Sequence, residues 1–293
     1  YASYILFGLA FIAFCVSAAG AVLFILLKIL GIPARIYLGP ISVFVMLVLF
    51  ACAFWGGFSA PQLKRVAISS PDLPALKIAV ISDSHLGMGV SYERWDNALT
   101  RLENEKPDVV FVLGDVFEYG PEADKYAARL AAFKTPLGTY GVLGNHEYYV
   151  GYGDSKDFFR KAGIKLLENE LTTLPNGVQI AGLKDIKTAR VTKQDVSNLL
   201  ANAAADEPLI VLSHTPSYAE EISNYGTDLM LSGHTHNGQI WPFNYLVKLQ
   251  FPRVYGLFDV QSMKFYITSG MFYWGIPLRL FAPAELPIIE VNP

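Results

Sequence analysis

The sequence predicts an α/β domain, with helices packed around mixed sheet, preceded by two transmembrane helices. Three observations predict this fold class. Two long runs almost without charge open the chain. From Lys77 onward, short apolar runs alternate with segments of helical periodicity. Polar residues follow directly after five of those runs, where open α/β sheets place their ligand crevices.

The two N-terminal runs predict a multi-pass integral membrane anchor over residues 1–58. Between Tyr4 and Leu30 the only charge is Lys28, and Ile36–Phe58 has none. Each run is long enough for the ~20 residues that cross a bilayer. The alternative is a signal peptide followed by a buried helix, but the first run is too long and has no basic leader. Because the chain does not begin with Met, we expect a trimmed fragment. Whether further membrane spans precede residue 1 remains open.

Charge leaves the orientation of the anchor open and argues against one class of partner. Lys28 and Arg35 lie on one side of the second run, and Lys64 and Arg65 on the other, so the positive-inside rule is nearly tied. A net charge of −3 argues against a nucleic-acid binder. Both cysteines fall inside the apolar runs, which predicts neither a disulfide framework nor a Cys-type metal site. The sequence carries no signal for an oligomeric state.

The rest of the chain divides into a linker, 59–76, and an α/β domain, 77–293. Prolines and serines in 59–76 predict the linker. Apolar runs rich in Val, Ile and Leu predict strands buried on both faces. These strands are Ile78–Ile81, Val109–Leu113, Tyr140–Leu143, Leu209–Leu212 and Leu229–Leu231. Helices are expected over Tyr92–Glu105, Asp154–Ala162 and Val191–Ala204, and a hairpin around Asn176-Gly177.

The blocks that follow the five strands contain all five histidines of the chain. They are Ser82-Asp83-Ser84-His85, Gly114-Asp115, Gly144-Asn145-His146-Glu147, Ser213-His214 and Ser232-Gly233-His234-Thr235-His236. A single Gly-Asp or Asp-x-His is usually a turn, but five such blocks together predict a metal site. Imidazole and carboxylate are ligands for divalent transition metals. Extended backbone would point Asp83 and His85 to one face, and likewise His234 and His236, with Thr235 turned away.

In order and spacing, these blocks resemble the calcineurin-like metallophosphoesterase family, from about Lys77 to Val291. The tail Ile276–Phe281 and the N-terminal runs are similar to the subgroup of transmembrane proteins with a metallophosphoesterase domain. The resemblance implies a sandwich of mixed sheets flanked by helices.

The resemblance also implies a role for each site residue. Asp83, His85 and His236 would hold a first divalent ion, and Asn145, His214 and His234 a second, with Asp115 bridging them. His146 would be catalytic, and Glu147 would support it or a ligand. The ions expected are Mn²⁺ first, with Zn²⁺ or Fe as alternatives. The family often has Asp three residues after the bridging residue, and Glu118 stands there instead, which leaves its supporting role open.

The function that this implies is a membrane-anchored, dinuclear-metal phosphodiesterase that attacks its substrate with a metal-bound hydroxide. Aromatic residues in 241–251 and 271–274 suggest a surface on the bilayer and a phospholipid or lipid-precursor substrate, although core and rim packing of the domain is the simpler explanation. One alternative is a pyrophosphohydrolase of a nucleotide-linked lipid such as UDP-diacylglucosamine. An alternative of another class is a non-catalytic metal-binding membrane module.

Overall fold

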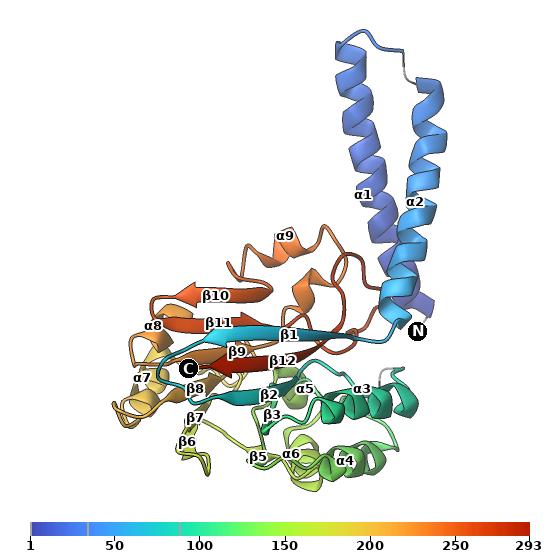
Figure 1. Cartoon of the computed structure of the whole chain (residues 1–293). Coiled ribbons are helices and arrows are strands. Elements are labelled where there is room, and N and C mark those ends of the chain that lie inside the picture. Colours follow the sequence, from blue (N-terminus) through green and yellow to red (C-terminus); the bar gives the residue numbers. More distant parts are fainter. Residues whose placement is uncertain (1, 34, 88) are drawn as a thin grey trace.

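Two long helices stand apart from an α/β domain. A computed structural model of the chain describes residues 2–33, 35–87 and 89–293; Tyr1 of the predicted anchor lies outside them. Helices α1 (Ala2–Ile29) and α2 (Arg35–Phe58) form a hairpin that projects from one corner of the domain (Figure 1). Both are long and apolar enough to cross a membrane, and only 6% and 11% of their most apolar windows are buried. They are therefore not core helices of the domain.

The domain is a sandwich of two six-stranded sheets, as the resemblance implies. The first sheet has the order β1-β12-β2-β3-β4-β5 and the second β10-β11-β9-β8-β7-β6. The strands of the first sheet are β1 (Gln62–Ser69), β2 (Leu76–Ile81), β3 (Val109–Val112), β4 (Thr139–Gly141), β5 (Lys165–Leu166) and β12 (Glu285–Asn292). Those of the second are β6 (Glu170–Thr173), β7 (Gln179–Gly182), β8 (Leu209–Leu212), β9 (Leu229–Ser232), β10 (Gly256–Val260) and β11 (Met263–Ile267).

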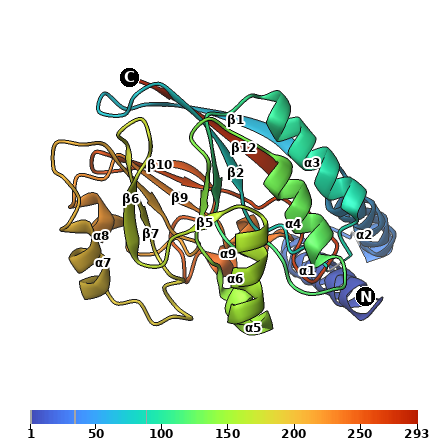
Figure 2. The same cartoon turned by 90° about the horizontal axis from the view of Figure 1, so that it is seen from below.

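Apolar side chains from both sheets form the layer between them, and helices cover the outer faces (Figure 2). The first sheet is covered by α3 (Tyr92–Asn104), α4 (Ala123–Ala132) and α6 (Tyr152–Lys161), and the second by α7 (Lys193–Leu200) and α8 (Ala219–Ser223). Three short helical segments lie elsewhere: α5 (Asn145–Val150), the 3₁₀ turn η1 (His236–Gly238) and α9 (Asn244–Val247).

Much of the segment predicted as a linker, 59–76, belongs to the first sheet instead. β1 pairs in parallel with β12 along its whole length. Its Val66 and Ile68 are buried in the layer between the sheets, and Ala67 between them is exposed. The prolines that suggested a linker, Pro61 and Pro71, flank this strand rather than interrupt it. Proline is tolerated at such positions because no ladder hydrogen bond is lost there.

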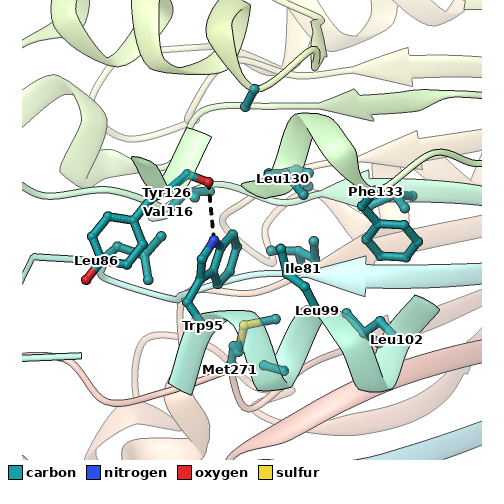
Figure 3. Packing of buried hydrophobic residues seen from close by; sticks show 14 of the residues in the cluster. Ile81, Leu86, Trp95, Leu99, Leu102, Val116, Tyr126, Leu130, Phe133 and Met271 are labelled. Atoms are coloured by element: carbon teal, nitrogen blue, oxygen red, sulfur yellow. Dashed lines mark hydrogen bonds between the residues drawn. The ribbon is translucent and has the colours of Figure 1, made fainter. Parts of the chain in front are cut away.

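A buried apolar cluster fixes the loops that follow β2 and β3 (Figure 3). Trp95 of α3 is fully buried, and its indole N–H donates to the carbonyl of Tyr126 at 3.3 Å. Around it pack Ile81 and Leu86, which bracket the Asp83 block, and Val116, which follows Asp115. Because close-packed side chains have few alternative positions, the polar residues between them are held in place.

The helix hairpin is docked on the domain as well as joined to it. Its two domain-proximal ends share an apolar cluster with Ile240, Leu278 and Leu280. A Cβ on Gly56 would lie 2.2 Å from the carbonyl oxygen of Arg279, so α2 approaches this segment as closely as backbone permits. The Arg279 amide also donates to the carbonyl of Ala53 in α2 at 3.0 Å.

Candidate metal centre

The predicted site residues lie together where the carboxyl ends of strands from both sheets meet. β2, β3 and β4 are parallel neighbours in the first sheet, and β8 and β9 in the second. Parallel strands end at the same edge of a sheet, so the loops after them converge. The structure brings together Asp83, His85, Asp115, Asn145, His146, His214, His234 and His236.

Two groups of potential metal ligands lie side by side. In the first, His236 Nε2 is 3.3 Å from Asp83 Oδ1, and His85 Nε2 is 3.1 Å from His236 Nε2. The second is formed by Asp115, His214 and His234.

Asp115 lies between the two groups. Its Oδ2 is 3.2 Å from His214 Nε2 and 3.9 Å from His85 Nε2. A single carboxylate therefore reaches both groups, as a bridging ligand would.

The local backbone differs from the extended conformation expected of these residues. Asp83 and His85 have φ of 53° and 42°, and His234 and His236 have φ of 72° and 48°. The expectation of strand alternation is therefore wrong, because each block turns as soon as its strand ends. Positive φ is uncommon for residues with a Cβ and recurs at functional sites. The Thr235 hydroxyl donates to the carbonyl of Val254 at 2.6 Å.

Glycines allow the loops to approach one another. Gly114 has φ of +85°, and a Cβ there would lie 2.2 Å from the amide nitrogen of Gly144. A Cβ on Gly144 would in turn lie 2.2 Å from Oδ1 of Asp115. Any side chain at these positions would push the loops after β3 and β4 apart.

Hydrogen bonds on the outer side of the site leave ring nitrogens free to bind metal. His214 Nδ1–H donates to the carbonyl of Leu113 at 2.6 Å, which turns its Nε2 toward Asp115. His85 Nδ1–H donates to Glu118 at 2.5 Å, so its Nε2 faces His236. This is the pattern by which proteins fix the tautomer of metal-binding histidines. Within the described residues, the buried Oδ1 of Asn145 has no hydrogen-bond partner. The donor set therefore fits divalent metal ions.

Electrostatics favour a carboxylate at the centre of the site. Burial raises the pKa of Asp115, but the charge and hydrogen bond of His214 outweigh burial and hold this pKa below its ordinary value. Burial alone would lower the pKa of His214, whereas Asp115 raises it well above normal. Burial and the neighbouring His214 lower the pKa of His234 to about 4. Asp115 is thus ionised and His234 neutral at pH 7, the forms that bind metals.

Glu118, whose role the sequence left open, supports two histidines. Its Oε1 accepts from His85 Nδ1 at 2.5 Å and from His146 Nδ1 at 2.7 Å. Its longer side chain therefore still reaches the site. Burial lowers the pKa of His146, but the bond to Glu118 and the charge of Asp115 reverse this and leave the pKa raised. Glu118, His85 and His146 also lie close enough to form a third potential ligand group, although both Nδ1 atoms donate to the carboxylate.

Glu147 supports the loop that carries Asp115. Its carboxylate accepts from the backbone N–H groups of Gly144, Asp115 and Val116 at 2.7–2.9 Å. Burial and the charge of Asp115 raise the pKa of Glu147 to about 7. Its role is to hold backbone rather than to orient His146.

Arg279 lies beside a predicted metal ligand, a position that the sequence did not assign to it. It is buried, and it donates to the carbonyls of Phe272, Ala282 and Ser269, each at 2.8 Å. Its Nη2 lies 3.1 Å from His236 Nδ1. Since its own backbone contacts α2, Arg279 connects the docked hairpin to a predicted metal ligand. The available signal was a single charged residue in the apolar run Ile276–Phe281. A buried arginine needs several hydrogen-bond acceptors, so such a residue indicates a specific buried contact.

The site opens into a cavity of about 600 Å³ with two unlike sides. The side that we call the histidine side is lined by His85, Asp115, Asn145, His146, His234 and His236. The side that we call the apolar wall is lined by Phe7 and Phe11 of α1, Phe243 and Leu246 at α9, and Ile276.

Comparisons with known proteins agree with this geometry. Residues 76–238 match the family model described as calcineurin-like phosphoesterase. An uncharacterised metallophosphoesterase of Campylobacter jejuni is 37% identical over 238 residues, which cover 79% of this chain and 63% of that protein. A transmembrane protein with metallophosphoesterase domain from Bos taurus is 31% identical, over 84% of this chain and 60% of that protein. The chain thus spans less than two thirds of the length of either relative.

Among solved structures, a dimetal phosphatase from Danio rerio is similar with a TM-score of 0.42 and 14% identity, over 70% of this chain and 89% of that one. The segment matched by the family model, 76–238, contains all five polar blocks. This chain therefore belongs to the calcineurin-like phosphoesterase family.

Proposed function

We propose that the chain is a membrane-anchored phosphodiesterase whose site holds two divalent metal ions. The observation that carries the proposal is the pair of ligand groups joined by Asp115. In this assignment Asp83, His85 and His236 would hold the first ion, Asn145, His214 and His234 would hold the second, and Asp115 would serve both. When bound, two such ions supply Lewis-acid stabilisation of phosphate oxygens and activation of water.

The residues of the chain supply positioning and a proton. His146 lines the cavity, and Glu118 holds its Nδ1, so Nε2 is the nitrogen left for the substrate. The raised pKa of His146 favours its protonated form, which can donate to the leaving alkoxide. Asp115 Oδ1 accepts from the His146 amide at 2.9 Å, which ties the proton donor to the centre of the site.

The hairpin of α1 and α2 makes this enzyme an integral, multi-pass membrane protein in our proposal. Both helices have the length and hydropathy of membrane spans, and relatives in Bos taurus and Danio rerio carry the name transmembrane protein. Their apolar surfaces are exposed, which favours contact with lipid. We accordingly propose a phospholipid or lipid-precursor phosphodiester as the substrate.

The structure does not favour a pyrophosphohydrolase of a nucleotide-linked lipid. A pocket for a diphosphate would need cationic side chains, for which Arg253 and Arg279 are candidates, but Arg253 is 2.7 Å from Glu220, and Arg279 is buried against backbone carbonyls. Neither lines the cavity described above. A second phosphate would therefore meet no arginine of this pair.

The test is hydrolysis of bis-p-nitrophenyl phosphate and p-nitrophenyl phosphate by the full chain in detergent, stripped of metal and reloaded. We expect the diester to be cleaved faster than the monoester, with Mn²⁺ more effective than Zn²⁺ or Fe²⁺. His146→Ala should lose activity while it keeps its metal. An inactive reloaded wild type with two bound ions would instead support the non-catalytic metal-binding module.

A further inference from the structure

We propose that the apolar wall is a binding subsite for the hydrocarbon chain of an amphiphilic phosphodiester, and that the first membrane helix is therefore part of the substrate site. This inference rests on the proposed function and makes its substrate class specific. The observation that carries it is that one cavity is lined both by Asp115 and His146 and by Phe7 and Phe11 of α1.

The cavity is larger than a phosphate group requires. Its volume of about 600 Å³ lies within the range of ~300–1,000 Å³ that holds ligands with many heavy atoms. A phosphate placed on the histidine side leaves room along the apolar wall. Whatever part of the substrate lies there extends away from the reacting phosphorus.

The chemistry of the apolar wall selects a hydrocarbon. Phe7, Phe11, Phe243, Leu246 and Ile276 present rings and aliphatic carbons, and the described lining residues include no lysine or arginine. A sugar or a second phosphate would lose its hydration there without a charged partner. Each methylene that leaves water for such a wall raises affinity by about fourfold.

The wall lies where a bilayer would deliver a lipid. Helix α1 has 28 residues, about 42 Å at 1.5 Å per residue, which exceeds a hydrocarbon core of ~30 Å. Phe7 and Phe11 lie in its first turns, at the end of the hairpin nearest the domain (Figure 1). Because 69% of Phe7 is exposed while Phe7 also lines the cavity, it belongs to both the lipid-facing surface and the site. A chain can pass from bilayer to cavity along it.

Contacts between α1 and the domain hold the wall in position. The rings of Phe11 and Phe243 meet edge to face, with centroids 6.0 Å apart. One turn from Phe11, Gly8 packs so closely that a Cβ there would lie 2.7 Å from Ile276 Cγ2. Leu246 and Leu249, on and just after α9, extend the same apolar surface outward and are 55% and 83% exposed.

The experiment compares two diesters that share a scissile bond, methyl p-nitrophenyl phosphate and hexadecyl p-nitrophenyl phosphate. The full chain, loaded with Mn²⁺ in mixed micelles, is assayed for kcat/KM with each. We expect the wild type to favour the hexadecyl ester by at least about tenfold, and Phe7→Ala to reduce this ratio by about tenfold. Phe14→Ala is the matched control, because Phe14 is equally exposed at 70% on the same helix and does not line the cavity.

A second measurement does not depend on activity or on a folded variant. A hexadecyl phosphonate with a photoreactive diazirine on its chain is bound to the metal-free wild type, and the cross-links are mapped by mass spectrometry. We expect them to concentrate at Phe7, Phe243 and Leu246, and to disappear when unlabelled hexadecyl phosphonate competes.

The outcomes separate the subsite from the proposed function. Three results would overturn the subsite: equal kcat/KM for the two esters, an equal loss of preference in Phe14→Ala, or cross-links spread over α1 and α2. In each of these cases, hydrolysis of the methyl ester would still uphold the phosphodiesterase. Failure of the Mn²⁺-loaded chain to cleave either ester would overturn both.

Discussion

The histidine side of the cavity is made mostly of buried polar residues in the segments that follow strands, whereas the apolar wall is made of partly or largely exposed hydrophobic residues, most of them at helices α1 and α9. Asp83, His85 and His214 are fully buried, yet each has polar partners. Phe7 and Leu246 are more than half exposed. Each arrangement costs free energy unless it has a binding partner. Buried polar groups need hydrogen-bond or metal partners, and exposed apolar surface favours association. The first suits metal ions and the second suits a bilayer.

The largest effect is expected from breaking the centre of the histidine side. Asp115→Ala removes the carboxylate that lies between the two ligand groups. Activity should fall by more than about 100-fold, because even the loss of a residue that only supports a metal ligand costs up to about 100-fold. Metal analysis should show fewer than two ions per chain. Retention of both ions by this variant would contradict the bridging assignment.

A smaller effect should follow from changing a support of the histidine side. Glu118→Gln removes the charge that raises the pKa of His146 and so lowers this pKa. Because a group with a lower pKa loses its proton at lower pH, the basic limb of the kcat–pH profile should move toward acid. We expect a 10- to 100-fold loss at neutral pH.

The matched control for that variant is Glu122→Gln, an exposed glutamate paired with Lys125 nearby in the chain. It should leave the profile unchanged. An unshifted basic limb in Glu118→Gln would show that His146 does not supply the proton.

Arg279 tests whether the two sides of the cavity are coupled. Arg279→Met leaves three buried carbonyls without their donor, which costs about 3 kcal/mol of unfolding free energy at ~1 kcal/mol each. Chemical denaturation in detergent should show this loss, together with weaker binding of the ion at His236. Arg129→Met, which removes partly buried ion pairs with Asp96 and Glu103, is the comparison. A similar loss of metal in both variants would refute a specific coupling.

The smallest effect is expected at the contact that docks the apolar wall. Gly56→Val would force α2 away from the carbonyl of Arg279, at a cost of about 1–3 kcal/mol for overpacking. The thermal midpoint in detergent should fall. Gly39→Val lies on the same helix, where a Cβ meets nothing within 4 Å, and should leave the midpoint unchanged. Equal midpoints for the two variants would mean that the hairpin is only tethered.

Short-range patterns predicted much of the fold. The core strands β8 and β9, the hairpin of β6 and β7 and the helix after Ser91 lie within a few residues of their predicted positions. They are specified by apolar runs, an Asn-Gly turn and a cap, which are local signals. β1 was missed because it is an edge strand whose partner, β12, lies more than 200 residues away in the sequence.

The sequence by itself determined which residues would gather, because ligand-type side chains follow strands whose ends must meet in a layered sheet. It also predicted two apolar helices long enough to cross a membrane, since hydropathy is a property of a continuous segment. Only the tertiary structure decided that these blocks turn through positive φ, that Glu118 reaches two histidines, and that Arg279 lies between α2 and His236. The position of Phe7 beside the site likewise depends on the docking of a helix, which no local pattern encodes.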